Sequence, residues 1–246
     1  MTRLLSLLAL LAVAPLAPSA SVAPPAAEGY ASVDEPDTDS LLVVVLGSST
    51  AAGTGPSHRD STWVERFRRH LRDVDARFAV LNLARGGYTT FHLMPAGTTG
   101  VPEGLLNAPD PGRNIDAALA RDPVAIVINL PSNDVTVGVG TEVQMANFAV
   151  MVARAEAAGV PVWITTTQPR DLEPAQVAVQ QVVRDAILAR YGDRAIDFWT
   201  GFADPDGQQA DRWGSGDHVH YNDAAHRVFA DRVRASGLAE TVLAGD

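Results

Sequence analysis

Short apolar runs alternate with longer amphipathic stretches from Leu41 onward. Two runs, Leu41–Leu46 and Ala125–Leu130, are almost entirely apolar, which is typical of strands buried on both faces. Weaker runs predict three more strands, Phe78–Leu83, Val160–Thr165 and Ala195–Phe198. Between the strands, apolar residues recur at the spacing of helices in Thr62–Val74, Glu142–Ala158, Pro174–Tyr191 and Asn222–Ser236.

This alternation of five strands with helices predicts an α/β fold, with a parallel sheet covered on both faces. Right-handed crossovers then restrict the order of the strands. Open parallel sheets bind their ligands beyond the carboxyl ends of the strands. We therefore expect the loops after Leu46, Leu83, Leu130 and Thr165 to meet at one edge of the sheet.

Two segments do not follow the alternation. Gly86–Arg113 is rich in Gly and Pro and shows little periodicity, and a connection of this length in a compact domain is more often a functional wall or lid. Thr200–Gly216 is a second, shorter irregular loop, and it leads into the polar turn at Asp217.

The N-terminal region has the composition of a targeting segment. Residues 1–23 contain the basic Arg3, the apolar run Leu4–Ala14, and then small residues and prolines, which is the layout of a secretory signal peptide. The alternative is an N-terminal membrane anchor, for which the run is short. Residues 24–40 lack hydrophobic periodicity and predict a disordered linker. The sequence therefore predicts a secreted or periplasmic protein, with no membrane anchor after cleavage, whose folded domain is residues 41–246.

Two residue types are absent from the chain, and each absence excludes chemistry. There is no cysteine among the 246 residues, and all 19 basic residues are arginine. Disulfides, thiolate nucleophiles and cysteinyl zinc sites are therefore excluded, as are Ser-Lys dyads and lysine Schiff bases. The formal net charge of −10 argues against nucleic acid or an anionic membrane surface as a partner, and favours a small molecule.

A serine and an acid–histidine turn supply the parts of a nucleophilic hydrolase. Ser49 directly follows the first strand in a loop bracketed by Gly47 and Gly53, where a tight turn exposes a hydroxyl. Asp217 and His220 are three residues apart in the polar turn near the C-terminus. Triads are recognised by the roles of their members and not by chain order. Taken alone, the serine loop also fits a turn that caps a helix.

Two further loops could stabilise a negatively charged oxygen. Gly87 lies in Asn82–Thr90, where a residue without Cβ presents its N–H at close range. Asn133 follows the Ala125–Leu130 run within Pro131-Ser132-Asn133-Asp134, and its side-chain amide is a second potential oxyanion donor.

In their order along the chain (Ser49, Gly87, Asn133, then Asp217 and His220), the four loops resemble the four sequence blocks of the SGNH/GDSL hydrolases, over about Leu41 to Ser236. The resemblance implies a three-layer α/β/α sandwich around a mostly parallel, five-stranded, flavodoxin-like sheet. It implies that Ser49 is the nucleophile and that Asp217 and His220 are the acid and the base. The implied oxyanion hole comprises the Ser49 N–H, the Gly87 N–H and the Asn133 side chain, and no metal or cofactor is expected.

The function that this resemblance implies is an exported serine esterase that hydrolyses carboxylic esters with short acyl or acetyl groups, esters of carbohydrates among them. Lipases and acyl-thioesterases share the same blocks and stay open as alternatives. Trp199 and Trp213 fit either a sugar-stacking platform or ordinary packing. Two positions depart from the family blocks: Ser48 replaces an aspartate, which we expect to affect loop packing, and Pro131 replaces a glycine.

Two other interpretations of the histidines near the C-terminus stay open. Asp223 and His226 repeat the acid–histidine spacing, but they follow the N-cap residue Asn222, so we expect His226 on a helix in a surface or boundary role. His218, His220 and His226 together with Asp223 are also of the right types for a metal-dependent hydrolase.

The remaining histidines and the glycine-rich loop suggest weaker hypotheses. We expect His218 to be solvated or to line a wall, and His92, on the long loop, to contact substrate. His58 and His70 have no acid at catalytic spacing. A flavin phosphate loop after the first strand and a non-catalytic carbohydrate-binding module are alternatives from other functional classes.

Overall fold

The computed structural model of the protein describes residues 39–130 and 132–245. The predicted signal peptide, nearly all of the predicted linker, and Pro131 lie outside these residues.

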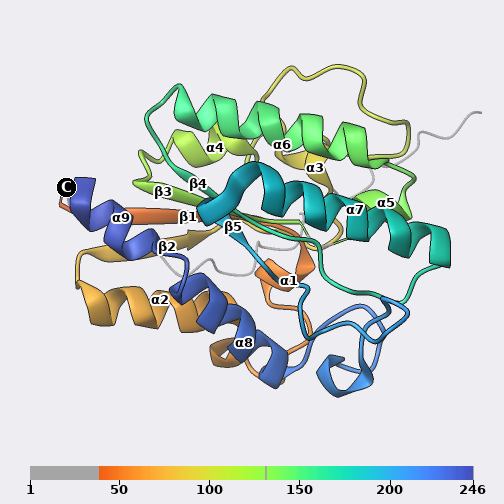
Figure 1. The fold of residues 1–246 in the computed structure, drawn as a ribbon. Helices are drawn as coiled ribbons and strands as arrows, with labels where there is room; N and C mark the ends of the chain where they lie inside the picture. The colour runs from red at the N-terminus through yellow and green to blue at the C-terminus, as the bar shows by residue number, and fades with distance from the viewer. Residues whose placement is uncertain (1–38, 131, 246) are drawn as a thin grey trace, which may run out of the picture. The chain divides into compact units, whose positions relative to one another are not determined.

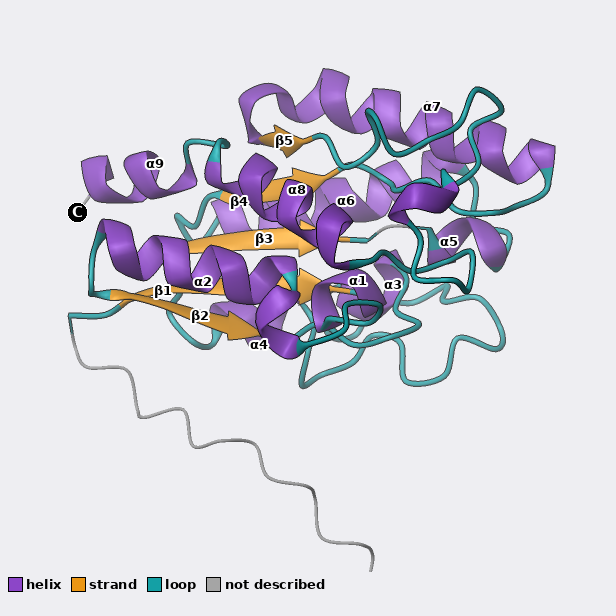
Figure 2. Cartoon of the chain, turned by 90° about the horizontal axis from the view of Figure 1, so that it is seen from below, coloured by secondary structure: helices purple, strands orange, loops and turns teal. Residues whose placement is uncertain are grey.

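The core of the fold is a parallel five-stranded sheet with the strand order β2-β1-β3-β4-β5. Its arrows point in one direction in Figure 2. The strands are β1 (Leu41–Gly47), β2 (Phe78–Asn82), β3 (Ala125–Asn129), β4 (Val162–Thr165) and β5 (Ala195–Ile196). All five lie within or next to the predicted runs, so the α/β prediction is confirmed. The order reverses between β1 and β3, the position at which sheets of this type bind ligands.

Helices cover both faces of the sheet, which makes the three layers seen in Figure 1. On one face lie α2 (Trp63–Val74), α8 (Asp223–Arg234) and α9 (Leu238–Gly245). On the other lie α3 (Thr90–Leu93), α4 (Ile115–Leu119), α6 (Thr141–Glu156) and α7 (Pro174–Tyr191). Because strand side chains alternate in direction, Val43 and Val45 pack against the first group, whereas Val44 and Leu46 pack against the second.

Two short helices lie at the carboxyl edge of the sheet, where they follow the central strands. Helix α1 (Ser49–Ala52) begins two residues after β1 ends, and α5 (Asn133–Thr136) begins four residues after β3 ends. Neither was predicted, because four residues are too few to show helical periodicity. They carry two of the predicted site residues.

Strands β2 and β3 are one residue shorter than predicted, and β4 and β5 are two residues shorter, the last two each for a local reason. Strand β4 begins at Val162 because Pro161 has no N–H for the ladder, although the Pro161 carbonyl still accepts from the Ile126 N–H. Strand β5 ends at Ile196 because the side chain of Asp197 accepts hydrogen bonds from two of the following backbone N–H groups and turns the chain away.

The long irregular segment Gly86–Arg113 is anchored at its two ends. It contains the short helix α3. The Asp110 N–H donates to the His92 carbonyl at 3.0 Å, and the Ala96 N–H donates to Asp116 Oδ2 at 2.8 Å. Tyr88 also donates a hydrogen bond from its hydroxyl to the Asp110 carboxylate. These contacts fix both ends of the segment, and the expectation of a wall or lid stays a prediction.

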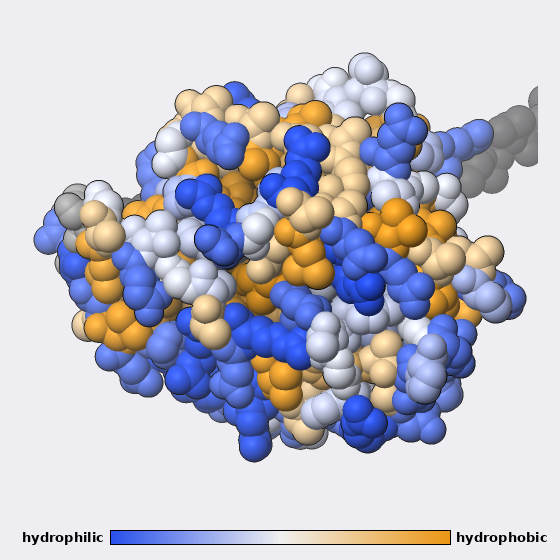
Figure 3. Space-filling view, in the orientation of Figure 1, coloured by the Kyte–Doolittle hydropathy of each residue, from blue (hydrophilic) through white to orange (hydrophobic). Residues whose placement is uncertain are grey.

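The surface seen in Figure 3 mixes polar and apolar residues. In the part of the chain that the structure describes, every helix is too short or too polar to span a bilayer.

Candidate active site

Ser49 is the first residue of α1 and is partly exposed at the carboxyl edge of the sheet. The helix ends at Ala52 and is capped by Gly53, whose N–H donates to the Ser49 carbonyl. The Asn82 side chain, at the end of β2, holds this short helix in place: its Nδ2 donates to the Ala51 carbonyl at 2.7 Å, and its Oδ1 accepts from the Ala84 N–H at 3.0 Å. Because β1 and β2 are neighbours, these bonds couple the serine loop to the glycine loop.

The turn before α8 brings Asp217 and His220 to Ser49. His220 Nε2 lies 2.9 Å from Ser49 Oγ, and His220 Nδ1 lies 2.6 Å from Asp217 Oδ2. The other carboxylate oxygen, Oδ1, accepts from the backbone N–H groups of Val219 and His220 at 3.0 and 2.8 Å. The three side chains that sequence reasoning selected therefore form one continuous hydrogen-bonded chain.

The hydrogen bonds at Asp217 keep its carboxylate ionised. Burial by itself would raise the pKa of Asp217. The bonds from the His220 backbone, the His220 ring and the Val219 N–H outweigh burial and hold this pKa well below its usual range. A permanent negative charge thus lies against Nδ1 of the imidazole, and this arrangement fixes a proton on Nδ1 and leaves Nε2 to face the serine hydroxyl.

Gly55 allows the loop after α1 to lie directly against this turn. Its φ is +112°, and a Cβ at this position would lie 2.3 Å from the Tyr221 carbonyl oxygen and 3.1 Å from the His220 Cβ. A side chain of any size would displace the backbone that carries His220. No local sequence pattern marks this glycine, since the contact joins segments far apart in the chain.

Two free backbone N–H groups lie in the loops that meet at Ser49. Neither the Ser49 N–H nor the Gly87 N–H donates to another atom of residues 39–130 and 132–245. Gly87 has a φ of +82° and is exposed, with open space where a Cβ would be. Its neighbour Gly86 approaches the serine more closely, since a Cβ there would lie 3.8 Å from the Ser49 Cβ.

The Asn133 amide is fixed in one orientation by three contacts. Its Nδ2 donates to Ser48 Oγ at 2.6 Å and to the Tyr88 carbonyl at 2.9 Å, and its Oδ1 lies 3.5 Å from Arg170 Nη1. The expectation that Ser48 affects only loop packing is therefore incomplete, because this buried serine contacts the amide itself. Both Nδ2 protons have an acceptor, so a substrate oxygen would take the place of one of them.

Asp134, next to Asn133, ties α5 to the long segment. Its carboxylate accepts from the Thr90 N–H at 3.1 and 3.0 Å and from the Thr90 hydroxyl at 2.6 Å. Burial raises the pKa of Asp134 to about 6, although the hydrogen bonds from Thr90 partly oppose this. The role of this carboxyl is to hold the position of its neighbour, since it is buried and faces Thr90.

The loop between β4 and α7 braces the acid–histidine turn, which no local sequence pattern predicts. Asp171 pairs with His218 at 2.8 Å, and the Asp171 N–H donates to the His218 carbonyl at 3.2 Å. The Tyr221 hydroxyl donates to the Pro169 carbonyl, and Gln168 accepts from the Thr50 hydroxyl at 2.9 Å. His218 is solvent-exposed, as expected, but it is also part of this brace.

His226 is fully buried, so the expectation of a surface or boundary role was wrong. It lies on α8, and its Nδ1 accepts from the Trp63 N–H at 3.1 Å at the start of α2. Burial lowers the pKa of His226 to about 3. The first N–H groups of a helix have no acceptor within that helix. The His226 ring supplies an acceptor for the first N–H of α2. Asp223 faces elsewhere and accepts from Ser57.

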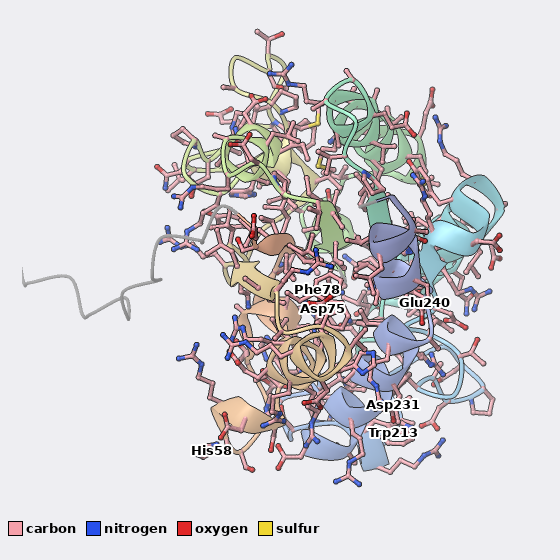
Figure 4. All side chains as sticks on the ribbon, turned by 90° about the vertical axis from the view of Figure 1, so that its left-hand side faces the viewer. His58, Asp75, Phe78, Trp213, Asp231 and Glu240 are labelled. Carbon is pink, nitrogen blue, oxygen red and sulfur yellow. The ribbon has the colours of Figure 1, made fainter. Side chains whose placement is uncertain are left out.

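The other histidines lie away from Ser49. His92 is buried, accepts from the Thr89 N–H and stacks on Tyr88 with ring centroids 4.4 Å apart, so the expected contact with substrate is not supported. Figure 4 shows the side of the molecule where β2 starts at Phe78, and His58 lies at the periphery of this view. The Nδ1 of His58 accepts from the Asp60 N–H. His70 lies on α2, with its pKa lowered by burial.

The histidines near the C-terminus do not share one site. His218, His220 and His226 face Asp171, Asp217 and the Trp63 N–H, respectively. Within the described residues, no group of three or more His, Asp or Glu side chains is arranged to hold a metal ion. Each of these histidines thus has a separate partner, and this arrangement does not favour the hypothesis of a metal-dependent hydrolase.

The two tryptophans near the acid–histidine turn pack against protein. Trp199 is buried beneath the Arg184 guanidinium, which lies 5.3 Å from the ring centroid. Trp213 packs on Phe202, and its indole N–H donates to the Gly201 carbonyl at 2.7 Å. Of the two readings of these residues, packing is the one that the contacts support.

A Ser–His–Asp arrangement at the carboxyl edge of a parallel sheet covered on both faces is characteristic of serine hydrolases. Residues 45–228 match the model of the GDSL-like lipase/acylhydrolase family, and the chain belongs to this family. Membership makes the protein a serine ester hydrolase and confirms the resemblance inferred from the four loops. No curated protein matches the chain.

Solved structures share the fold at low sequence identity. The psychrotrophic esterase EstA from Pseudoalteromonas sp. is 17% identical with a TM-score of 0.59, over 80% of this chain and 96% of its own. An acylhydrolase from Bacteroides fragilis is 17% identical with a TM-score of 0.59, over 86% and 92%. The acetyl xylan esterase AlAXEase is 14% identical with a TM-score of 0.56, over 79% and 98%. At these identities, the likeness is one of fold.

Proposed function

We propose that this protein is an exported esterase that hydrolyses carboxylic esters with short acyl or acetyl groups through an acyl-enzyme on Ser49. The observation that supports the proposal best is the unbroken chain from Ser49 Oγ to His220 at 2.9 Å and from His220 to Asp217 at 2.6 Å. His220 takes the serine proton as Oγ attacks the ester carbonyl, and then gives it to the leaving alcohol. Asp217 keeps the imidazole in the orientation and tautomer that this transfer needs.

The oxyanion in this proposal is held by the Ser49 N–H, the Gly87 N–H and Asn133 Nδ2. The first two donors have no acceptor within the part of the chain that the structure describes, which suits groups that must meet a charge that develops only during the reaction. The third is preoriented by its contacts with Tyr88 and Ser48, and the oxyanion takes over the bond now made to Ser48 Oγ. Water then hydrolyses the acyl-enzyme by the same route, without a metal or cofactor.

Acetylated carbohydrates are a substrate class that the structural neighbours suggest. One neighbour is named as an acetyl xylan esterase, and another as a two-domain esterase active on acetylated mannans. Export, which rests on the signal-like composition of residues 1–23, would place the enzyme where such polymers occur. A lipase or acyl-thioesterase of the same fold is the alternative within the family.

The proposal is tested by comparing the two acid–histidine pairs in hydrolysis of 4-nitrophenyl acetate. We expect His220→Ala and Asp217→Asn to lower kcat by several orders of magnitude, because a serine without its base is a weak nucleophile. The matched controls are Asp223→Asn and His226→Gln, for which we expect kcat within about tenfold of the wild-type value. An inactive His226→Gln beside an active His220→Ala would contradict the assignment, provided that circular dichroism shows both variants to be folded.

A further inference from the structure

Arg170 places a positive charge beside the proposed oxyanion donor. It lies in the loop between β4 and α7, is partly buried, and has its Nη1 3.5 Å from Asn133 Oδ1. The same amide contacts Ser48, the residue before the proposed nucleophile. Only the Asn133 side chain therefore separates the guanidinium from the loop that carries the proposed nucleophile.

The donors of Arg170 are largely unused. An arginine has five N–H donors in a planar fork. In the described parts of the chain, the contact with Asn133 is the one hydrogen bond of this side chain. Among the described residues, its Nε is buried without an acceptor and no carboxylate forms an ion pair with it. Burial lowers the pKa of Arg170, and the negative charge of Asp217 partly offsets this. Such a cation is poorly compensated by the protein itself.

Asp217 is near Arg170 but is not available to neutralise it by direct contact. Its Oδ1 accepts from the Ser215 hydroxyl and from two backbone N–H groups, and its Oδ2 is engaged by the His220 ring. A bond from Arg170 to this carboxylate would compete with the orientation of the imidazole. Nη2 of Arg170 makes no hydrogen bond within the described residues and is not buried, so it can reach an acceptor on a ligand.

The loop holds Arg170 in place on both sides. The preceding Pro169 carbonyl accepts from Tyr221, and the following Asp171 pairs with His218. Leu172 exchanges hydrogen bonds with the side chain of Gln208 at 2.9 and 2.8 Å. Because the backbone is fixed, the loop itself need not be ordered when the guanidinium binds an anion.

We propose that Arg170 is a specificity-determining residue that binds a carboxylate on the substrate, next to the ester group that Ser49 attacks. A carboxylate is the planar acceptor that matches the arginine fork, and it would bind at the terminal Nη groups, since Nε is buried. The inference rests on the proposed esterase function and narrows its substrate class to esters that bear an acidic group. The carboxylate can belong to the acyl part or to the alcohol part of the ester.

The test measures kcat/KM for two pairs of esters that differ only in carboxylate against carboxamide. The acyl pair is the 4-nitrophenyl monoesters of glutarate and glutaramate, and the alcohol pair is 3-acetoxybenzoate and 3-acetoxybenzamide. We expect the wild-type enzyme to favour the carboxylate in at least one pair by about tenfold or more, equivalent to about 1.4 kcal/mol. In Arg170→Gln that ratio falls to near one, and in Arg170→Lys, which keeps the charge but not the fork, it takes an intermediate value.

The matched control is Arg184→Gln, which removes an arginine that covers Trp199 and pairs with Asp185. This variant should keep the wild-type ratios. Ratios near one for the wild type, or a preference that Arg170→Gln retains, would overturn the inference while leaving the esterase function intact. Failure of the wild type to hydrolyse any of the four esters in a Ser49-dependent manner would overturn the esterase function and the inference together.

Discussion

At the scale of single residues, the clearest feature of the site is how firmly each polar group is oriented. Asn133 shows this best, because its amide is held by a hydroxyl, a carbonyl and a guanidinium at once. An amide can present either end to a ligand unless its neighbours choose between them. Here the Tyr88 carbonyl requires a donor and Arg170 requires an acceptor, so Nδ2 faces the serine loop.

This orientation leads to a prediction for Asn133→Ala. We expect a loss of about 10²–10³ in kcat, or about 2.7–4 kcal/mol, the usual effect of removing one oxyanion donor. KM should change little, because the lost bond forms in the transition state. Steady-state kinetics on 4-nitrophenyl acetate measure both constants.

Ser48→Ala is the control for this prediction. It removes one acceptor of the amide but leaves Tyr88 and Arg170 to orient it, so we expect kcat within about tenfold of the wild-type value. If Asn133→Ala had an unchanged kcat, the amide would be a structural group and the proposed oxyanion hole would lose a member.

The residues of the proposed triad could be predicted from the sequence because each follows a strand or precedes a helix in a short, recognisable block. Gly55 and Arg170 could not be predicted in this way. Gly55 contacts a segment more than a hundred residues away, and Arg170 contacts Asn133, thirty-seven residues away. Neither contact leaves a periodic pattern or a fixed spacing in the chain.

At the scale of elements, the contact between α2 and α8 explains the one histidine whose environment was predicted wrongly. The helical spacing of α8 was evident from the sequence, and its N-cap Asn222 accepts from the Ala224 and Ala225 N–H groups as expected. The partner of the helix was not evident. Because α2 packs directly on α8, His226 is buried and is needed as the acceptor for the Trp63 N–H.

Burial of His226 predicts an acid-dependent loss of stability. The pKa of this ring is about 3 in the folded protein, against an ordinary value of 6.5. Between these values the unfolded chain binds the extra proton, so the free energy of unfolding decreases as the pH falls. From pH 7 to pH 5 this group accounts for a loss of about 2 kcal/mol.

His226→Gln tests this, because glutamine keeps an acceptor but does not titrate. Urea unfolding of both proteins at pH 7 and pH 5 should show a smaller pH dependence for the variant, by about 2 kcal/mol. Asp134, with its pKa raised to about 6, acts in the opposite direction over part of this range, but both proteins retain it and its effect cancels in the comparison. Equal pH dependence in the two proteins would show that His226 is accessible to protons in the folded state.

At the scale of the whole molecule, the order of the strands determines which loops can form a site. Strands β1 and β3 are adjacent and lie on either side of the point where the order reverses, so the loops carrying Ser49 and Asn133 meet. Strand β2, on the other side of β1, adds the glycine loop. This convergence was predictable from the α/β alternation alone. The bracing of the C-terminal turn by the β4–α7 loop was not, because side-chain pairs such as Asp171 and His218 depend on the folded loop geometry.

We propose that Ser49 is the nucleophile, and covalent labelling identifies the reacting residue without reference to any substrate. A fluorophosphonate reacts with a serine only when a base activates the hydroxyl. We expect mass spectrometry of the digested, labelled protein to find one phosphonylated residue, Ser49, with labelling and ester hydrolysis both lost in Ser49→Ala and labelling greatly slowed in His220→Ala. Labelling at the neighbouring Ser48, or hydrolysis of 4-nitrophenyl acetate by Ser49→Ala at the wild-type rate, would contradict the claim.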